Sequence, residues 1–187
     1  SSSYRKAIYP LYKQNRKDKY ANQTEEEQQE FEQFFAEVQQ ILSMYEEEGK
    51  FPVVRFQGVE ADDIAAYIVA KRKRYSLDQI WLISSDKDWD LLVTDGVSRF
   101  SYVTRKEITV DNWNEHYDFS VDDYISIKCL TGDSGDNVMG VPGIGPKRAV
   151  QLIEEYGSTY DIISALPISS KYKYISALNE FGADNLM

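Results

Sequence analysis

A glycine-rich connection between two apolar helical patterns is the feature that most constrains how this chain folds. The stretch CLTGDSGDNVMGVPGIGPKRAVQLIEEYG, residues 129–157, joins a helix predicted over about 121–131 to a second that begins near Pro146. The loop is rich in glycine, and Gly140, Gly143 and Gly145 stand in the part of it nearest the second helix. Glycines allow a tight turn whose backbone N–H groups can meet a phosphate, and Pro146 suits the first position of a helix. With Lys147 and Arg148 next in that helix, the stretch predicts a helix–hairpin–helix that contacts DNA phosphates.

Acidic residues gather at three places along the chain. The set consists of Glu60, Asp62, Asp63, Asp86, Asp88, Asp133 and Asp136. Adjacent carboxylates repel one another unless a cation lies among them, although acidic residues also suit the first turn of a helix. Around Asp88 a calcium-binding loop is excluded, because Leu91 stands where such a loop needs glycine. Taken alone, each of the first two clusters is more typical of a helix start or a turn than of a metal site.

Strand and helix patterns alternate between residues 51 and 103. Residues 51–56, 79–84 and 98–103 are predicted strands, and a helix follows the turn at Gly58. Strand–helix–strand order predicts a parallel α/β sheet, in which ligand sites lie beyond the carboxyl ends of the strands. The first two acidic clusters directly follow predicted strands. This placement is a reason to consider them together, as ligands of a hard divalent cation.

The longest predicted helix begins at Thr24, where the sequence Thr-Glu-Glu-Glu has the pattern of a capping box. Apolar residues follow at helical spacing: Phe31, Phe34, Phe35, Val38, Ile41, Leu42 and Tyr45. We expect this aromatic stripe to pack into a core.

The formal net charge of −10 argues against a nucleic-acid partner, but the charges are unevenly distributed. Residues 4–19 hold six Lys or Arg residues and one Asp, with three tyrosines among them. Residues 25–48 hold nine Glu and no basic residue. Tyrosines can stack on bases while Lys and Arg hold phosphates, so the first segment shifts the balance from a solvated basic face toward single-stranded nucleic acid.

The chain of 187 residues is expected to form one domain, or one with a small appendage. Its one cysteine, Cys129, permits no internal disulfide, and its one histidine, His116, is expected at the surface. Neither a zinc site nor a Ser–His or Cys–His catalytic pair has support. No apolar run reaches membrane-spanning length, and the N-terminus does not have the pattern of a signal peptide. These features predict a cytoplasmic protein without a membrane partner.

The motifs EADD, SSDKDWD, GDSGDN and GVPGIGPKRA stand in the order of the 5′ nuclease family, which the chain resembles from about Ser3 to its end. The family includes phage flap endonucleases, which look most similar, and the 5′→3′ exonuclease domain of bacterial DNA polymerase I. The resemblance implies a PIN-like α/β fold, with a parallel sheet flanked by helices, a helical arch and a helix–hairpin–helix subdomain. It divides the chain into an arch and α/β nuclease core over residues 1–118 and a helix–hairpin–helix DNA-binding region over residues 119–187.

The activity implied by this resemblance is that of a structure-specific 5′ nuclease, both flap endonuclease and 5′→3′ exonuclease. It would hydrolyse DNA phosphodiesters with two Mg²⁺ ions, for which Mn²⁺ can substitute. Glu60 and Asp62 would ligate one ion. Asp86, Asp88 and Asp133 would serve the second. Asp63 and Asp136 would be shared or act through water.

The segment YRKAIYPLYKQNRKDKY resembles the family's arch, through which a 5′ single strand passes. By this resemblance Lys13 and Arg16 would hold the scissile phosphate and Tyr12 would contact the terminal base. Further DNA contacts are assigned to Arg5, Lys6, Gly143, Gly145, Lys147 and Arg148. The helix–hairpin–helix would also bind K⁺. The expected partner is DNA with a 5′ flap or a 5′ end, met by a monomer in the cytoplasm of the host if the protein is phage-encoded.

Family members begin with a strand, a helix and a second strand, and each strand ends in a metal-binding aspartate. This chain starts just after the second aspartate, so we expect an N-terminal portion to be absent and these residues alone to bind DNA but cut it poorly. Two alternatives stay open. A cleavage-deficient homologue acting as a DNA-binding module leaves the clustered acids unexplained, and a PIN-type Mg²⁺-dependent RNase leaves the helix–hairpin–helix unexplained.

Overall fold

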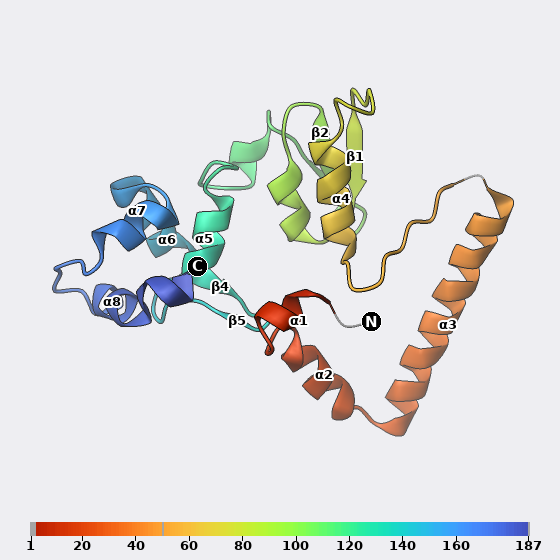
Figure 1. Ribbon diagram of the computed structural model, residues 1–187, viewed down its shortest axis with the longest axis horizontal. Coiled ribbons are helices and arrows are strands. Elements are labelled where there is room, and N and C mark those ends of the chain that lie inside the picture. Colours follow the sequence, from red (N-terminus) through yellow and green to blue (C-terminus); the bar gives the residue numbers. More distant parts are fainter. Residues whose placement is uncertain (1–2, 50, 187) are drawn as a thin grey trace. The chain divides into compact units, whose positions relative to one another are not determined.

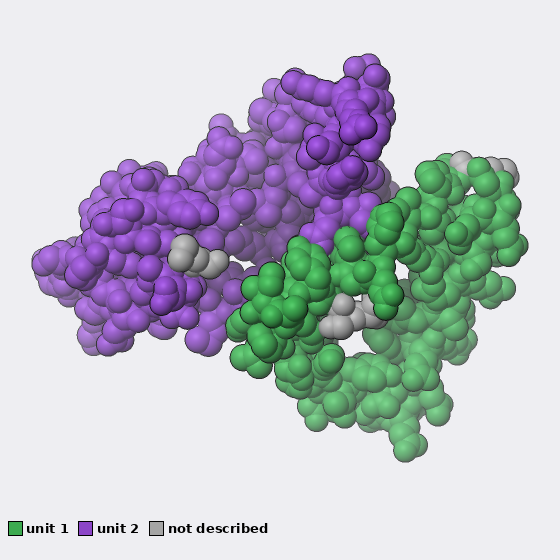
Figure 2. All heavy atoms as spheres, in the orientation of Figure 1, with its two compact units in different colours: residues 1–61, 135–137 green, residues 62–134, 138–187 purple. Residues whose placement is uncertain are grey.

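The computed structural model describes residues 3–49 and 51–186 and divides the chain into two compact units (Figures 1 and 2). Unit 1 consists of residues up to 61 together with residues 135–137. Unit 2 consists of residues 62–134 and those from 138 onward. The short segment 135–137 therefore belongs to the first unit although both of its neighbours in sequence belong to the second.

Unit 1 contains the helices α1 (Arg5–Ile8), α2 (Gln14–Ala21) and α3 (Glu25–Glu48). The predicted capping box is confirmed, because the Thr24 hydroxyl accepts the amide of Glu27 while the Glu27 carboxylate accepts the amide of Thr24. These bonds satisfy two amides that a helix start otherwise leaves free. Gly49, at φ 62°, ends α3 in the left-handed conformation that glycine adopts without strain.

The aromatic stripe of α3 does not form the core that its spacing predicted. The apolar side chains most exposed along it are Phe31, Phe34, Phe35, Ile41 and Tyr45, which are 44–58% exposed, and no residue of α3 is buried. The rings contact one another instead, with 4.7 Å between the centroids of Phe31 and Phe35. Helical spacing identifies which face of a helix is apolar, but it does not establish that another element covers that face.

The predicted strand over residues 51–56 is also wrong. These residues form no strand, and the side chains of Phe51, Val54 and Phe56 are 51–61% exposed. A strand needs a neighbour to satisfy its backbone N–H and C=O groups. Within the described part of the chain, residues 51–56 have no such neighbour in any β-ladder.

The sheet of unit 2 contains β1 (Ile80–Ile83), β2 (Val97–Ser101) and β3 (Lys106–Ile108), in that order. The two strands predicted near residues 80 and 98 are confirmed as a parallel pair, and β3 adds antiparallel to β2. Figure 1 shows α4 (Ala61–Ala70) lying alongside this sheet. A small core of Ala65, Leu82 and Val97 joins the helix to the sheet. An α/β core of this kind places α4, from Asp62 onward, and the end of β1 in one unit.

A buried ion pair fixes the short helix η1 (Lys87–Leu92), which follows β1. Asp90 is fully buried and accepts hydrogen bonds from Arg99 on β2 and from the Tyr117 hydroxyl. The hydrogen bond to Asp90 raises the pKa of Arg99 against the opposing effect of burial. Burial, reinforced by the same carboxylate, raises the pKa of Tyr117. Asp90 is therefore a structural residue that holds the acidic segment before it against the sheet.

The remaining helices form the best-packed part of unit 2. They are α5 (Tyr124–Thr131), α6 (Pro146–Tyr156), α7 (Thr159–Ala165) and α8 (Lys173–Leu186), whereas the short helix η2 (Trp113–Glu115) packs into a separate core with Val93 and Ile108. Leu130, Ile162 and Leu178 are wholly buried at their centre. Burying a side chain of this size contributes roughly 2 kcal/mol relative to leaving it exposed. The two helices that flank the glycine-rich loop, α5 and α6, thus rest on a common core.

A two-stranded hairpin, β4 (Gly132–Asp133) and β5 (Val138–Met139), leads from α5 toward α6. A Cβ on Gly140 would lie 2.2 Å from the carbonyl carbon of Thr131, so only glycine fits there. The expected helix–hairpin–helix is therefore present, with Gly145 preceding α6 and Pro146 at its first position. None of the described helices combines the length and apolar character needed to cross a membrane.

Candidate metal and nucleic-acid site

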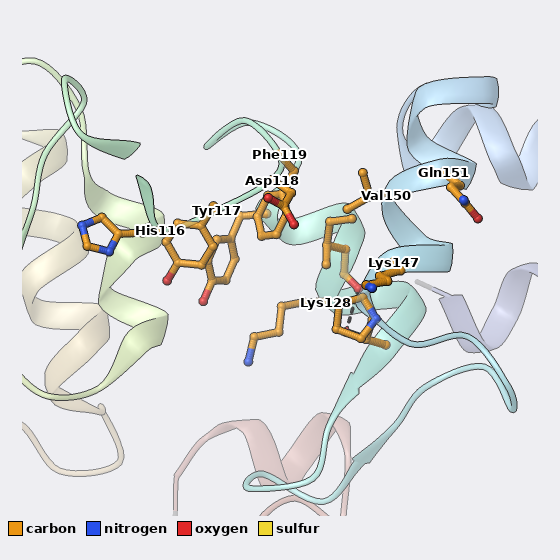
Figure 3. Close-up of a pocket in the computed structure, with 12 residues that line it drawn as sticks. His116, Tyr117, Asp118, Phe119, Lys128, Lys147, Val150 and Gln151 are labelled. Carbon is orange, nitrogen blue, oxygen red and sulfur yellow. Dashed lines mark hydrogen bonds between the residues drawn. The ribbon is translucent and has the colours of Figure 1, made fainter. Parts of the chain in front are cut away.

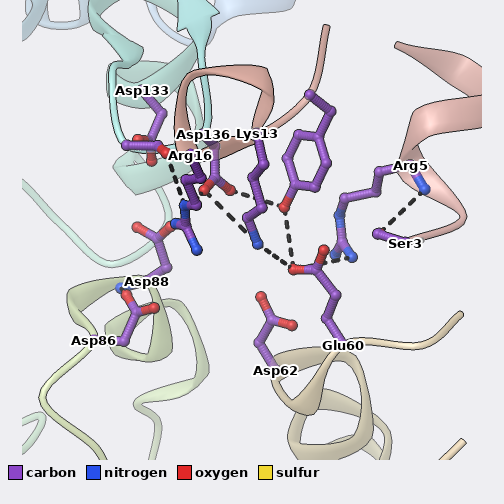
Figure 4. A network of polar contacts seen from close by, with 12 residues as sticks. Ser3, Arg5, Lys13, Arg16, Glu60, Asp62, Asp86, Asp88, Asp133 and Asp136 are labelled. Atoms are coloured by element: carbon purple, nitrogen blue, oxygen red, sulfur yellow. Dashed lines mark hydrogen bonds and ion pairs between the residues drawn. The ribbon is translucent and has the colours of Figure 1, made fainter. Parts of the chain in front are cut away.

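In unit 1, two carboxylates and the base of the arch segment form one polar cluster (Figure 4). The Lys13 Nζ lies 2.6 Å from Oε2 of Glu60 and 3.7 Å from Oδ1 of Asp136. The Tyr12 hydroxyl lies 2.8 Å from Oδ2 of Asp136 and 3.1 Å from Oε2 of Glu60. Glu60, which directly precedes α4, and Asp136, in the 135–137 segment, therefore share one ammonium and one hydroxyl.

Burial and hydrogen bonding together determine the protonation states of Glu60 and Tyr12 in this cluster. Burial opposes ionisation of Glu60, yet hydrogen bonds from Lys13 and neighbouring hydroxyls hold its pKa below the ordinary value. Burial and the hydrogen bond to Asp136 raise the pKa of Tyr12. Tyr12, only 6% exposed, thus stays protonated and donates, while Glu60 stays an anion.

Arginines surround the same two carboxylates. The Arg16 Nη2 lies 2.8 Å from Oδ1 of Asp136, and its Nε donates to the carbonyl of Gly135 over 3.2 Å. The Arg5 guanidinium lies 3.9 Å from Glu60. The Arg16 side chain is 59% exposed, so its guanidinium is open to a ligand. Lys6 follows Arg5 in α1.

A backbone hydrogen bond and a side-chain hydrogen bond hold residues 135–137 to the arch segment. The Lys13 amide donates to the carbonyl of Asp136 over 2.9 Å, and the Asn137 side chain donates to the carbonyl of Leu11 over 2.8 Å. Both Lys13 and Asn137 adopt positive φ, at 54° and 60°. Such angles are uncommon for residues other than glycine and are kept where the surroundings impose them. Residues 135–137, at the tip of the β4–β5 hairpin, therefore pack closely against the arch segment, which contains the expected catalytic residues Tyr12, Lys13 and Arg16.

Unit 2 contains a second cluster of the same type. The Lys128 Nζ on α5 lies 2.8 Å from Oδ1 of Asp88 and 2.6 Å from Oδ2 of Asp133. Burial disfavours its charge, but hydrogen bonds to Asp133 and Asp88 dominate and raise the pKa of Lys128. Asp86 caps η1, because its carboxylate accepts the amide of Asp88 over 3.0 Å. Here too an ammonium joins two of the expected metal ligands.

Asp62 and Asp63 lie in the first turn of α4, where the helix dipole favours negative charge. The Asp63 amide donates to the carboxylate of Asp62 over 3.1 Å. The seven acids are thus divided between the units: Glu60 and Asp136 in unit 1, and Asp62, Asp63, Asp86, Asp88 and Asp133 in unit 2. Within residues 3–49 and 51–186, no group of three or more His, Cys, Asp and Glu side chains is arranged to hold a metal ion.

The chemistry of these side chains nevertheless fits a hard divalent cation. Every expected ligand is a carboxylate, which is the donor that Mg²⁺ and related ions prefer. In each unit a lysine ammonium already lies between two carboxylates. In each unit the carboxylate oxygens therefore surround a positive charge. A metal ion that replaced the ammonium would be bound by the same oxygens.

In the helix–hairpin–helix, two cations lie next to each other where the glycine-rich loop meets α6. Lys147 and Arg148 lie exposed in the first turn of α6. The Arg148 Nη1 donates to the carbonyl of Gly143 over 2.5 Å, and Gly143 adopts φ 79°. The guanidinium is thereby held against the loop and faces solvent.

A pocket of about 590 Å³ lies beside these elements (Figure 3). Figure 3 shows Lys147, Val150 and Gln151 of α6 on one side of it and His116 and Tyr117 on the other. His116 is half-buried at the pocket rather than free at the surface. The clustered acids do not line this pocket, although Lys128, which contacts two of them, does. The pocket therefore does not coincide with the expected site of the chemistry.

Two residues of the site, Lys128 and Asn137, and one residue that supports it, Asp90, have roles that the sequence did not reveal. Lys128 was not singled out, although a lysine in an apolar helix five positions before Asp133 was a visible signal. Asn137 belongs to the motif GDSGDN, but that pattern does not indicate its positive φ. Asp90 stands two positions after Asp88 in the same motif, SSDKDWD, and nothing in the local sequence indicates that Arg99 is its partner.

Two family profiles together match almost the whole chain. The family described as "5'-3' exonuclease, N-terminal resolvase-like domain" matches residues 1–118, and "5'-3' exonuclease, C-terminal SAM fold" matches residues 119–186. The chain is 47% identical over 179 residues to a flap endonuclease of Escherichia phage T5, covering 95% of this chain and 60% of that protein. It is 27% identical over 177 residues to a 5'-3' exonuclease of Buchnera aphidicola, covering 95% of this chain and 57% of that protein.

Solved structures agree with these sequence matches. The T5 5'-exonuclease with bound zinc ions has a TM-score of 0.92 and 45% identity, covering 100% of this chain and 68% of that one. A T5 flap endonuclease variant in a pseudo-enzyme-product complex with DNA and metal ions has a TM-score of 0.92 and 44% identity, covering 100% and 67%. The chain spans about 60% of the length of the phage T5 relative. It belongs to the 5'-3' exonuclease family, with a resolvase-like N-terminal domain and a helical C-terminal domain.

Proposed function

We propose that this chain forms the larger part of a structure-specific 5′ nuclease, a flap endonuclease and 5′→3′ exonuclease that acts on DNA. One observation carries the proposal. In unit 1, side chains that can hold a phosphate, Lys13 and Arg16, contact the carboxylate of Asp136 directly. A phosphodiester bound there would lie next to carboxylates able to hold a metal ion. The name of the T5 relative, a flap endonuclease, supports the same substrate.

We propose Mg²⁺ as the metal, in two ions, with Mn²⁺ as a substitute. Glu60, Asp62, Asp86, Asp88 and Asp133 would hold them, with Asp63 and Asp136 shared or acting through water. Bound divalent ions would lower the pKa of water and stabilise the negative charge that develops on the leaving oxygen. The metal-containing structures of the T5 proteins support a metal requirement in those relatives. No catalytic histidine is then needed.

The residues of the arch would position the substrate. Lys13 and Arg16 would exchange their carboxylate partners for the oxygens of the scissile phosphate, which makes their contribution depend on bound DNA. Tyr12 stays protonated and would offer its hydroxyl or its ring to the terminal nucleotide. Removing one preorganised contact to developing charge typically costs about a hundredfold or more in rate.

The helix–hairpin–helix would hold the duplex behind the cut. Lys147 and Arg148 would neutralise phosphates there, and the loop at Gly143 and Gly145 would approach the backbone closely. We propose K⁺ as a further ion at this loop. Arg5 and Lys6 would add contacts on the arch side, and we propose that the protein acts as a monomer.

The test is cleavage of a labelled 5′-flapped duplex by the intact protein. We expect cleavage with Mg²⁺ or Mn²⁺ and none in excess EDTA. Asp88→Asn should abolish it, whereas Asp95→Asn, at an exposed acid in the turn before β2, should not. Undiminished cleavage in EDTA would contradict the proposal. DNA binding without cleavage would favour the DNA-binding module, and cleavage of an RNA flap but not a DNA flap would favour the RNase.

A further inference from the structure

Two tyrosines next to the helix–hairpin–helix form a surface that has no role in the proposed functions of the arch and the acidic clusters. Tyr172 and Tyr174 alternate with Lys171 and Lys173 at the start of α8. Their rings are stacked, with centroids 5.5 Å apart and planes inclined by 18°. The Lys171 Nζ lies 5.8 Å from the centroid of Tyr172. Lysines and aromatic rings that alternate in this way are typical of sites for single-stranded nucleic acid.

Arg148 connects these rings to the helix–hairpin–helix. Its guanidinium lies 4.8 Å from the centroid of Tyr174 while it donates to the carbonyl of Gly143. Tyr174 is half-buried beneath it, but Tyr172 is 53% exposed. The outer ring is therefore open to solvent, and the inner ring and the arginine fix its position.

The residues that line the surface around Tyr172 include two cations, Arg148 and Lys173, and no acid. This surface is concave, with a volume of about 540 Å³. Pro142, Gly143 and Arg148 line one side, and Tyr172, Lys173 and Tyr174 line the other.

We propose that this surface binds one unpaired nucleotide of a single-stranded DNA tail. The base stacks on the exposed ring of Tyr172, and Lys173 and Lys171 neutralise the flanking phosphates. A base inside a duplex has both faces covered by its neighbours, so only an unpaired or terminal base can offer a face to Tyr172. The inference rests on the proposed function for its ligand, DNA, and adds a site for a single strand beside the grip on the duplex.

The experiment measures fluorescence anisotropy of labelled DNA with the intact protein in EDTA, so that binding is read without cleavage. The probes are a blunt duplex and the same duplex with a thymidine tail at its 5′ or 3′ end. Tyr172→Ala should weaken binding of at least one tailed duplex by about fivefold or more, as loss of one base–aromatic stack predicts. Blunt-duplex binding should not change, and Tyr172→Phe should behave as the wild type because it keeps the ring.

Tyr160→Ala is the matched control, since Tyr160 is a 74% exposed tyrosine on α7. A second measurement uses the unmodified protein: a tail containing 5-iodouracil should crosslink on irradiation within the peptide that contains Tyr172. Equal affinities of the wild type and Tyr172→Ala for every tailed duplex would overturn the inference. So would an equal loss on tailed and blunt DNA, which would make Tyr172 a contact to the duplex.

These outcomes are separable from failure of the proposed function. If the intact protein cleaves flapped DNA with Mg²⁺ but tail binding ignores Tyr172, this inference fails and the nuclease assignment stands. If tail binding depends on Tyr172 but no metal-dependent cleavage occurs, the nuclease assignment fails and the nucleotide site stands.

Discussion

The arch segment and the helices that follow residue 119 are both mainly helical, yet they are stabilised differently. Among the described residues up to 60, Tyr12 alone is buried. In contrast, eleven residues form the buried core of the C-terminal helices: Ile127, Leu130, Val141, Ile144, Ala149, Leu152, Ile153, Ile162, Ile175, Leu178 and Leu186. The first region is held by hydrogen bonds and ion pairs, and the second by packing.

This difference agrees with the roles that we propose. A grip on the duplex should be preformed, because contacts made equally in every bound state contribute to affinity. Catalytic residues that are paired with carboxylates in the free protein, in contrast, must give up these ion pairs to bind the substrate. By our proposal Lys13 and Arg16 exchange the carboxylates of Glu60 and Asp136 for a phosphate, and such an exchange leaves the packed core of the fold intact.

The largest expected effect is on stability, through the core. Leu178→Ala should lower the free energy of unfolding by about 3 kcal/mol, because it removes a wholly buried side chain and leaves a cavity. Phe35→Ala on α3, at a ring that is 46% exposed, should cost roughly 0.5 kcal/mol or less. Urea denaturation of both variants checks this, and equal losses would show that the stripe on α3 packs as tightly as the core.

An intermediate effect is expected where an ammonium lies between two carboxylates. In EDTA, Lys128→Met should destabilise the protein by about 1 kcal/mol, because Asp88 and Asp133 lose their shared partially exposed partner. Saturating Mg²⁺ should remove much of the difference. Lys87→Met, at an exposed lysine of η1, is the control. A Lys128→Met protein that melts higher than the wild type in EDTA would contradict this account of the cluster.

The smallest effect concerns a helix cap in the well-packed region. At the start of α7, hydrogen bonds from the Ser158 hydroxyl and amide hold the pKa of Asp161 below its ordinary value. A carboxyl whose folded pKa is lowered stabilises the fold above its unfolded pKa of about 3.9, and this contribution is lost as the pH falls through the folded value. The wild type should therefore melt above Asp161→Asn at neutral pH, and the gap should narrow in acid. If the difference in melting temperature between the two proteins does not change with pH, the charged carboxylate of Asp161 does not stabilise the start of α7.

The sequence predicted those features that local residues determine. The capping box at Thr24, the strand at residues 80–83 and the helix start at Pro146 each depend on a few neighbouring side chains. Whether α3 and residues 51–56 acquire a partner depends on distant segments, and both predictions about them were wrong. Lys128 contacts Asp133, which is 5 positions away, but its other partner Asp88 and both partners of Lys13, Glu60 and Asp136, are distant in sequence. These long-range contacts could not be foreseen from spacing.

One measurement tests the division between catalytic face and grip most directly: single-turnover cleavage of 5′-flapped DNA at a series of protein concentrations. Lys13→Ala should lower the maximal rate by about a hundredfold or more and leave the half-saturating concentration nearly unchanged. Lys147→Ala with Arg148→Ala should raise the half-saturating concentration and flatten the slope of log affinity against log salt by about one to two units. Its maximal rate should stay near that of the wild type. The division between catalytic residues and duplex-binding residues is contradicted if both variants change the same parameter. It is also contradicted if the Lys147→Ala, Arg148→Ala variant binds normally at every salt concentration.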